Sequence, residues 1–329
     1  GGAGNDTIYL HDLLTIPDST SIVLDGQAGS DEYIIDLVKD SNRSFIINVK
    51  ESVVNGTDVN RLTINGTPLD DHFLIRANFV ALINLTTLKA QRINYDHNIN
   101  GRLQVYGFAG NDAFYVDDNS SITTLDGGDG NDSFQIGQMF KSKRDALAGV
   151  ALEDQFITVE TTRGYLSNGV SYALTAYGGN GNDTFQVYHN IAPVRLEGCD
   201  GDDTFIVRAF VVLDNSAKQA MTQINSGAGS DTIQYVVNAP VSIDGGDGFD
   251  TVIILGTEFA DNIVVTKDGV YGAGLFVTYE RIERLEVNGL EGNDHFFILS
   301  TNPNWTTVVV GDRGSDTFDI AGDVNVPII

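Results

Sequence analysis

The feature that most constrains this chain is a six-residue turn, rich in glycine and aspartate, that recurs from one end of the sequence to the other. One copy is Gly178-Gly179-Asn180-Gly181-Asn182-Asp183, and alternating apolar residues, Phe185 and Val187, follow it. Alternation of this kind predicts a strand that buries one face. After a bend and a second short strand the turn recurs at 198–203. The chain therefore returns to an equivalent position after about twenty residues.

The residue types of the turn suggest a chemistry. Glycines at the first and fourth places are expected to allow positive φ, so that backbone carbonyls can curl inward. The aspartate at the sixth place adds a carboxylate beside those carbonyls. Ligand sets made only of oxygen suit calcium. One short segment therefore predicts both a metal-binding turn and a core strand.

Ten copies keep both the fourth-place glycine and the sixth-place aspartate. A single copy would be a weak signal, because an isolated Gly-Asp turn is usually an ordinary hairpin or Asx turn. Ten copies in one chain are a strong one. The candidate metal ligands are the aspartates Asp6, Asp31, Asp112, Asp132, Asp183, Asp203, Asp231, Asp250, Asp294 and Asp316.

This pattern resembles the G-G-x-G-x-D-x-U-x repeat of the RTX, or haemolysin-type, calcium-binding family, whose chains wind into parallel β-rolls. The resemblance implies several Ca²⁺ ions, held between turns of adjacent coils by sixth-place aspartates and backbone carbonyls. The copies are spaced more loosely than in a tandem nine-residue array, with one motif in each coil.

The apolar residues predict the fold. An apolar residue stands two places before nearly every turn, and another stands two places after every sixth-place aspartate. The latter are Ile8, Tyr33, Phe73, Phe114, Phe134, Phe156, Phe185, Phe205, Ile233, Val252, Ile263, Phe296 and Phe318. We therefore predict an all-β fold, a single parallel β-solenoid over residues 1–329 with about 13 coils and the calcium turns along one edge. Such a rod would be on the order of 60 Å long.

Some parts of the chain depart from the repeat. Three turns lose the fourth-place glycine, at 66–71 with Leu69, at 149–154 with Leu152 and at 256–261 with Phe259. We expect these coils to stack without a full calcium site. Irregular excursions are predicted at 38–60, 75–100, 138–148 and 212–223. Because the chain begins within a copy of the turn, we expect it to be a segment of a larger repeat protein.

Charge and composition exclude several classes of function. The net charge of -26, from 19 basic and 45 acidic residues, argues against a nucleic-acid partner. No apolar run is long enough for a membrane span, so no membrane insertion is expected. The single Cys199 excludes an internal disulfide framework, and it occupies a second-place position where any small residue would serve.

The leading hypothesis is a calcium-binding structural module of an extracellular or cell-surface protein, a rigid rod in a filament or adhesin. Stacked aspartates repel one another, so folding and stacking would depend on Ca²⁺. We expect no enzyme activity, because the five histidines share no pattern and no nucleophile elbow, zinc set or P-loop occurs. The alternative is a carbohydrate-active enzyme, or an auxiliary module of a polysaccharide lyase or epimerase.

The expected partners are neighbouring solenoid segments of the same or an identical chain, and surface glycans are a further candidate. Nine N-glycosylation sequons occur, three of them within the Asn-Asp-Thr/Ser turns. The other six would suit a glycoprotein if the source is a eukaryote. They lie at Asn42, Asn55, Asn65, Asn84, Asn119 and Asn304.

Overall fold

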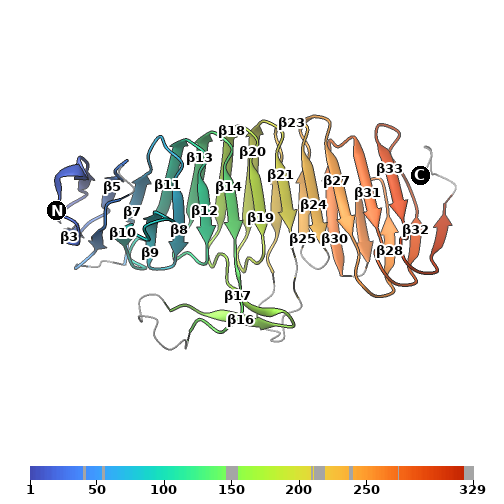
Figure 1. Cartoon of the computed structure of the whole chain (residues 1–329), viewed down its shortest axis with the longest axis horizontal. Coiled ribbons are helices and arrows are strands. Elements are labelled where there is room, and N and C mark those ends of the chain that lie inside the picture. Colours follow the sequence, from blue (N-terminus) through green and yellow to red (C-terminus); the bar gives the residue numbers. More distant parts are fainter. Residues whose placement is uncertain are drawn as a thin grey trace.

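The chain is all-β, as predicted. The computed structural model describes residues 1–39, 42–53, 56–145, 155–208, 210, 219–236, 240–272 and 274–321, and 53% of the chain is strand. Within these ranges there is no α-helix, and one 3-10 turn, η1 (Leu13–Thr15), follows the first long strand. Figure 1 shows the strands side by side along the longest axis of the molecule, with the two termini at opposite ends.

Two long sheets dominate the fold. In spatial order, the thirteen-stranded sheet contains β3 (Thr20–Asp25), β6 (Phe45–Lys50), β10 (Ala90–Asn94), β9 (Phe79–Ile83), β8 (His72–Arg76), β12 (Ala113–Val116), β14 (Ser133–Ile136), β19 (Thr184–Val187), β21 (Thr204–Val207), β24 (Thr232–Val236), β27 (Thr251–Leu255), β31 (Arg284–Asn288) and β33 (Thr306–Val310).

The sixteen-stranded sheet contains, in the same sense, β2 (Thr7–Leu10), β5 (Glu32–Asp36), β7 (Arg61–Asn65), β11 (Arg102–Ala109), β13 (Thr123–Asp129), β18 (Leu174–Asn180), β20 (Val194–Asp200), β22 (Thr222–Asn225), β25 (Pro240–Asp244), β30 (Leu275–Glu280), β29 (Gly269–Gly272), β28 (Asn262–Val265), β32 (His295–Ile298) and β34 (Thr317–Ile320), with the short β23 (Ala228–Gly229) and β26 (Asp247–Gly248) beside this path. A two-stranded sheet pairs β1 (Gly2–Ala3) with β4 (Gln27–Ala28).

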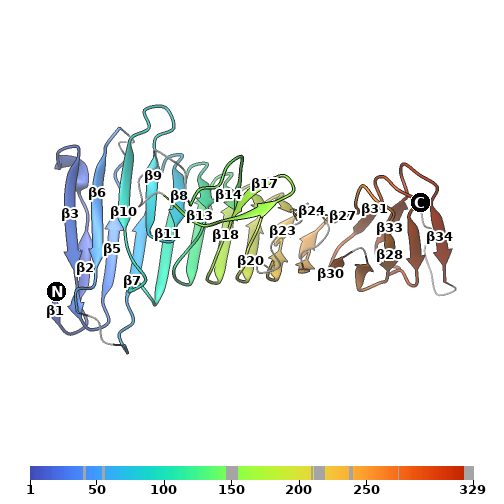
Figure 2. The ribbon, with the colours of Figure 1, turned by 90° about the horizontal axis from the view of Figure 1, so that it is seen from below.

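For most of its length the chain passes alternately through the two sheets, and we call one passage through both a circuit. Strands of successive circuits pair in parallel and without a shift in register, as in Phe134 opposite Phe185 and Phe185 opposite Phe205. Because strand side chains alternate between faces, equivalent residues stack on one another along the axis. Figure 2 shows the same elongated arrangement from below.

The core lies between the two sheets and follows the predicted alternation. Phe73, Phe114, Phe134, Phe185 and Phe205 form a continuous stack, with centroid separations of 5.0, 4.8, 4.7 and 4.8 Å. All five rings are at most 1% exposed. Phe318 continues the pattern near the C-terminal end, but it is 42% exposed because it stacks on Phe296 alone.

Two antiparallel meanders interrupt the parallel sheets. Strands β8, β9 and β10 pair antiparallel within the thirteen-stranded sheet. Strands β28, β29 and β30 do the same within the sixteen-stranded sheet. The predicted excursions at 38–60 and 75–100 are therefore wrong in part, since β6 and the first meander are integral strands of the sheet.

The prediction that all Gly-Asp turns lie along one edge is wrong. The turn at 26–31 joins β3 of the thirteen-stranded sheet to β5 of the sixteen-stranded sheet, whereas the turn at 107–112 joins β11 to β12 in the opposite direction. Because strands within each sheet run parallel, these two directions lie at opposite edges. We call them the 13-to-16 edge and the 16-to-13 edge. Every circuit crosses both edges, and the crossing that carries the Gly-Asp turn changes before each meander, at the turns at 66–71 and 256–261.

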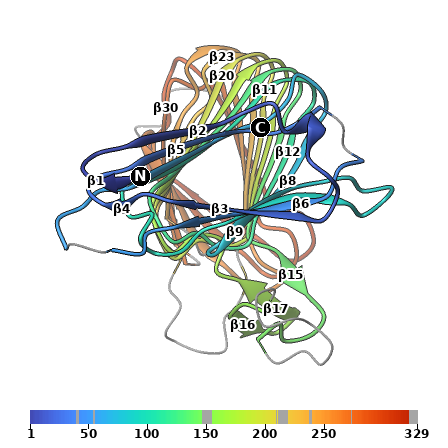
Figure 3. The same cartoon turned by 90° about the vertical axis from the view of Figure 1, so that its left-hand side faces the viewer.

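A small three-stranded antiparallel flap stands outside the two sheets (Figures 1 and 3). It contains β15 (Met139–Phe140), β17 (Gly164–Ser167) and β16 (Thr158–Thr161). The excursion predicted at 138–148 is thus longer than expected. Phe156, predicted to face the core, instead packs against Phe140 in the flap and under the Arg76 guanidinium. Residues 146–154 and 211–218, which cover the whole turn at 149–154 and most of the excursion at 212–223, lie outside the described residues.

Within the described residues, no helix has the length and apolar character needed to cross a membrane.

Candidate metal-binding turns

The glycines of the turn are required by close approach as well as by φ. The prediction that the first-place glycine needs positive φ is wrong, because the positive values occur at the second and fourth places. At the first place the restriction is steric: a Cβ on Gly127 would lie 2.0 Å from Oδ2 of Asp132 and 2.6 Å from the carbonyl oxygen of Gly178. At the fourth place, Gly130 has φ +137, and its Cβ would lie 1.8 Å from the Gly110 carbonyl oxygen.

The second place is less selective than expected. Cys199 has φ +78 there, but Phe108 and Leu290 also occupy this position, with φ of 78 and 72. Small size is therefore not the requirement at the second place. The side chain of the second-place residue points away from the turn, and its backbone adopts the positive φ that the turn requires.

The sixth-place aspartates form ladders of hydrogen bonds between circuits. In each step the backbone N–H of one aspartate donates to Oδ1 of the aspartate in the next circuit, as from Asp112 to Asp132 at 2.7 Å and from Asp183 to Asp203 at 2.7 Å. Three rows result: Asp6, Asp31, Asn60 and Asn100 on the 13-to-16 edge; Asp71, Asp112, Asp132, Asp183, Asp203, Asp231, Asp250 and Glu283 on the 16-to-13 edge; and Asp261, Asp294 and Asp316 on the 13-to-16 edge again. The structure thus brings the ten predicted aspartates together within rows, but not into one row.

Three members of these rows are not evident from the motif. Asn60 and Asn100 extend the first row, and Glu283 ends the central row by accepting the Asp250 N–H at 2.8 Å. All three stand at crossings between the sheets that carry no Gly-Asp turn, so their sequence context gives no signal. Only their position opposite a motif aspartate in the neighbouring circuit identifies them.

Fifth-place residues form a second ladder in the opposite sense. The Asn111 side-chain oxygen accepts the N–H of Asn131, and the Asn131 side-chain oxygen accepts the N–H of Asn182, both at 2.8 Å. The Asn-Asp pair in each turn therefore satisfies two backbone N–H groups that would otherwise have no partner inside the turn. This hydrogen bonding is a structural role for the motif that requires no metal.

One carboxylate oxygen remains unsatisfied in nine of the ten regular turns. Eight of the ten predicted aspartates are at most 1% exposed. Oδ2 is buried without a hydrogen-bond partner in Asp6, Asp31, Asp112, Asp132, Asp183, Asp203, Asp231, Asp250 and Asp294. A buried carboxylate oxygen without a partner is costly unless a proton or a cation compensates it.

The electrostatics of the central row reflect this burial. Removal from water raises the pKa of Asp112 and Asp203 to about 8 and that of Asp183 to about 7. The same cause raises the pKa of Asp132 and Asp250 to about 6. Backbone N–H groups oppose the shift but do not cancel it. In the absence of a cation these carboxyl groups therefore hold protons at a higher pH than exposed aspartates do.

In two of the three turns that lack the fourth-place glycine, a neighbouring threonine supplies hydrogen bonds to the sixth-place carboxylate. In the turn at 66–71, Oδ2 of Asp71 accepts the Thr67 N–H at 2.6 Å, and Oδ1 accepts the Thr67 hydroxyl at 3.0 Å. Thr257 makes the same contacts with Asp261. The bulky fourth-place residues point to solvent, with Leu69 52% and Phe259 76% exposed. Each of these turns stands at the start of a row.

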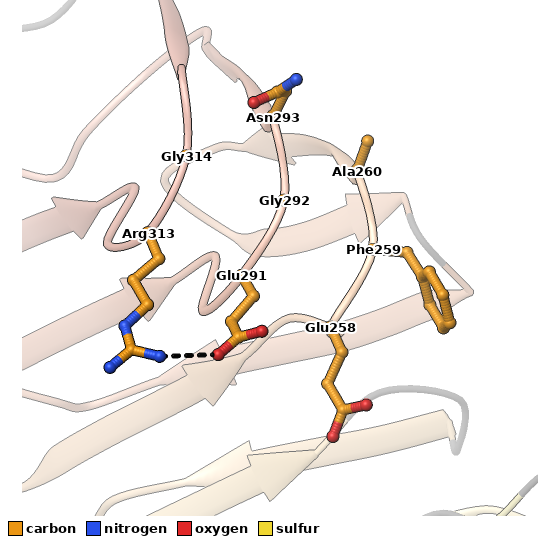
Figure 4. A pocket seen from close by; sticks show the side chains of 8 residues that line it. All are labelled: Glu258, Phe259, Ala260, Glu291, Gly292, Asn293, Arg313 and Gly314. Atoms are coloured by element: carbon orange, nitrogen blue, oxygen red, sulfur yellow. Dashed lines mark hydrogen bonds and ion pairs between the residues drawn. The ribbon is translucent and has the colours of Figure 1, made fainter.

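Figure 4 shows, from close by, residues of the three turns that precede the aspartates of the third row. The backbone segments at 258–260, 291–293 and 313–314 lie next to one another and line an open depression. Its polar groups are paired in part, since Arg313 lies 3.0 Å from Glu291. The third places of these three turns hold Glu258, Glu291 and Arg313, so this surface carries charges of both signs.

The donor chemistry of the regular turns suits a hard cation. The unsatisfied Oδ2 atoms are carboxylate oxygens, and the first-place carbonyl oxygens of the next circuit lie on the same side. Ca²⁺ prefers such ligands. Each regular turn supplies a single sixth-place carboxylate, and within the described residues no three His, Cys, Asp or Glu side chains converge. A cation here would take most of its ligands from the backbone.

One predicted glycosylation site is wrong for a structural reason. Asn119 is 1% exposed, and its side-chain nitrogen donates to the carbonyl oxygens of Ser121 and Tyr172. Asn55 lies outside the described residues.

Comparison with known proteins does not place this chain. No family model matches it, and no curated protein matches it significantly.

Proposed function

We propose that the chain is a calcium-stabilised β-solenoid that acts as a rigid structural module of a cell-surface or filament protein. In this interpretation the circuits are solenoid coils, and the resemblance to RTX repeats reflects a shared use of Gly-Asp turns. The observation that carries the proposal is the set of nine buried Oδ2 atoms without partners, arranged in rows along the edges.

The physical case rests on charge. Each row brings carboxylates into successive circuits, about one strand spacing apart, where deprotonated groups repel one another. Cations bound only by the folded chain would offset this repulsion and couple folding to calcium. The chain would then be stiff where calcium is abundant, as it is outside cells.

The parallel stacking supports a structural role. Equivalent residues repeat along one long axis, and the phenylalanine stack runs through five neighbouring strands. An array of this kind resists bending because every circuit is hydrogen-bonded to both neighbours. In a cell-surface protein it would hold other parts of the assembly at a fixed distance.

The test is thermal unfolding of the full chain in millimolar CaCl₂ and in chelator, with MgCl₂ as the cation control. We expect Ca²⁺ to raise the free energy of unfolding by about 2.7 kcal/mol per site at one hundred times the Kd. Mg²⁺ should do less, because it demands a stricter octahedral geometry. Equal stability in calcium and in chelator at neutral pH would contradict the proposal.

A matched pair of variants locates the effect. Asp183→Asn removes a carboxylate whose Oδ2 has no partner, and Asp71→Asn removes one whose oxygens are satisfied by Thr67. The calcium-dependent part of the stability should fall in Asp183→Asn and persist in Asp71→Asn. If both variants keep the full calcium response, the rows are not the site of binding.

A further inference from the structure

The outer face of the sixteen-stranded sheet carries an unusual set of side chains at its middle. Tyr106 and Phe108 of β11 are stacked, with centroids 6.1 Å apart. In the register of the sheet, Tyr106 lies opposite Asp126 of β13, and Asp126 lies opposite Tyr177 of β18. We call these four residues the aromatic strip. None of them is a sixth-place aspartate or has a part in the ladders.

The strip is exposed although it is aromatic. Phe108 is 49% and Tyr177 38% exposed. The inward neighbours in the same strands, such as Val105 and Ala176, are fully buried, so the strip residues point away from the core. Gly128 and Gly179 stand beside Phe108 in the sheet. Because glycine has no side chain, the two strands next to β11 place no side chain beside Phe108.

At the centre of the aromatic strip, the carboxylate of Asp126 has no hydrogen-bond or ion-pair partner among the described residues. The neighbouring acid, Glu197, is occupied by Arg195 and by Asn225, whose Nδ2 lies 2.8 Å from Oε2. The Tyr106 hydroxyl receives a hydrogen bond from Gln104 at 2.7 Å, which fixes the ring. Asp126 alone is left to accept hydrogen bonds from a ligand, and partial burial raises its pKa.

We propose that the aromatic strip binds a neutral polysaccharide that lies along the axis of the molecule. The Tyr106 and Phe108 rings on β11 and the Tyr177 ring two strands away on β18 offer flat, rigid surfaces to the apolar faces of sugar rings. Asp126, between two of these rings, accepts hydrogen bonds from sugar hydroxyls, and such bonds to a charged acceptor are strong.

The surroundings exclude other occupants. An apolar protein segment would bury Asp126 without a partner, which is costly. Acidic polymers would be repelled by Asp126 and by the net charge of -26, whereas Glu197 and Asp244 on the same face are paired with Arg195 and Arg281. The strands around the strip are paired on both sides, so they offer no free edge to an added strand.

The experiment uses the full chain in calcium and measures binding to cellohexaose, chitohexaose and mannohexaose, with a hexamer of mannuronate as the charged probe. We expect at least one neutral hexasaccharide to bind. Tyr177→Ala and Asp126→Ala should each weaken that binding at least tenfold. The control is Tyr115→Ala, a half-exposed tyrosine on the outer face of the thirteen-stranded sheet, which should bind like the parent chain.

The proposal is overturned if no neutral hexasaccharide binds, if mannuronate binds as tightly as the neutral sugars, or if Tyr115→Ala weakens binding as much as Tyr177→Ala. Circular dichroism and thermal unfolding of each variant show whether it is folded. The strip deepens the structural function by naming a partner, but the two fail separately. Calcium-independent stability would leave sugar binding intact, and loss of sugar binding at unchanged stability would leave the calcium rows intact.

Discussion

At the scale of single residues, the turn is governed by lack of space. First-place glycines bring the backbone against a buried aspartate, and fourth-place glycines bring it against the carbonyl of the preceding circuit. The backbone conformation alone explains only the second and fourth places. The motif suggests that glycine is needed for its backbone conformation. At the first place, however, glycine is needed because no larger side chain fits.

This distinction predicts the effect of Gly127→Ala. The new methyl group would meet Oδ2 of Asp132 and the Gly178 carbonyl oxygen, and the latter belongs to the backbone and cannot rotate away. We expect a loss of about 1–3 kcal/mol in the free energy of unfolding, as for other overpacked sites. Urea unfolding measures it. Gly56→Ala is the control, because a Cβ there meets nothing within 4 Å. A loss of equal size in both variants would refute the steric explanation.

At the scale of structural elements, each ladder couples neighbouring circuits through side chains as well as through the sheets. Oδ1 atoms and fifth-place oxygens satisfy backbone N–H groups at the edges, where a sheet would otherwise leave them without partners. The cost is a row of Oδ2 atoms that need protons or cations. The turns that contain Thr67 and Thr257 avoid this cost, because the threonine donates to the carboxylate, and each of them stands at the start of a row.

The central row predicts how stability depends on pH in chelator. Burial raises the folded-state pKa of Asp112 and Asp203 to about 8, above the unfolded value of about 3.9. Folding therefore takes up protons. The stabilising effect is fully present below the unfolded pKa and is lost as pH rises through the folded-state values.

We therefore expect the unfolding temperature in chelator to fall steadily as pH rises from about 4 to about 8. Added calcium at the upper end of this range should restore it. Differential scanning calorimetry across the pH series provides the measurement. A chelated protein that became more stable toward the upper end would show that the carboxylates are compensated by groups other than protons or metal.

At the scale of the whole molecule, the sheets form a continuous frame, and the chain enters and leaves the flap at one place. The backbone N–H of Ser167 donates to the Gln138 carbonyl oxygen at 3.0 Å, and the N–H of Gln138 donates to the Ser167 hydroxyl at 2.8 Å. The two ends of the flap therefore lie together, and the chain leaves and re-enters the frame at the same place.

This geometry predicts that residues 139–166 can be replaced by an Asn-Gly turn. Such a turn connects two antiparallel ends directly. We expect a folded chain with an unfolding temperature within about 5 °C of the parent, since among the described residues the frame loses mainly the contacts of Arg76 with Phe156 and the exposed ion pair of Arg163 with Glu258. The calcium response should be unchanged. A chain that failed to fold would show that the flap contributes to the frame.

The sequence predicted the all-β class and most of the core, because both depend on local alternation. Phe114, Phe134, Phe185 and Phe205 were identified as inward by their place after the turn, and they are buried. The same rule failed for Phe156, whose segment belongs to the flap. Periodicity describes a residue within a strand, but it cannot say which sheet, if any, that strand joins.

The identity of the motif aspartates was also written in the sequence, since six consecutive residues define each turn. Tertiary structure decided everything that depends on which circuits are neighbours. It placed the turns on two edges, because every circuit crosses between the sheets at both edges and the motif moves from one crossing to the other at 66–71 and again at 256–261. It also recruited Asn60, Asn100 and Glu283, which contact the rows across at least 29 residues of sequence. The local sequence determines each turn by itself, whereas long-range strand pairing determines which turns become neighbours in a row.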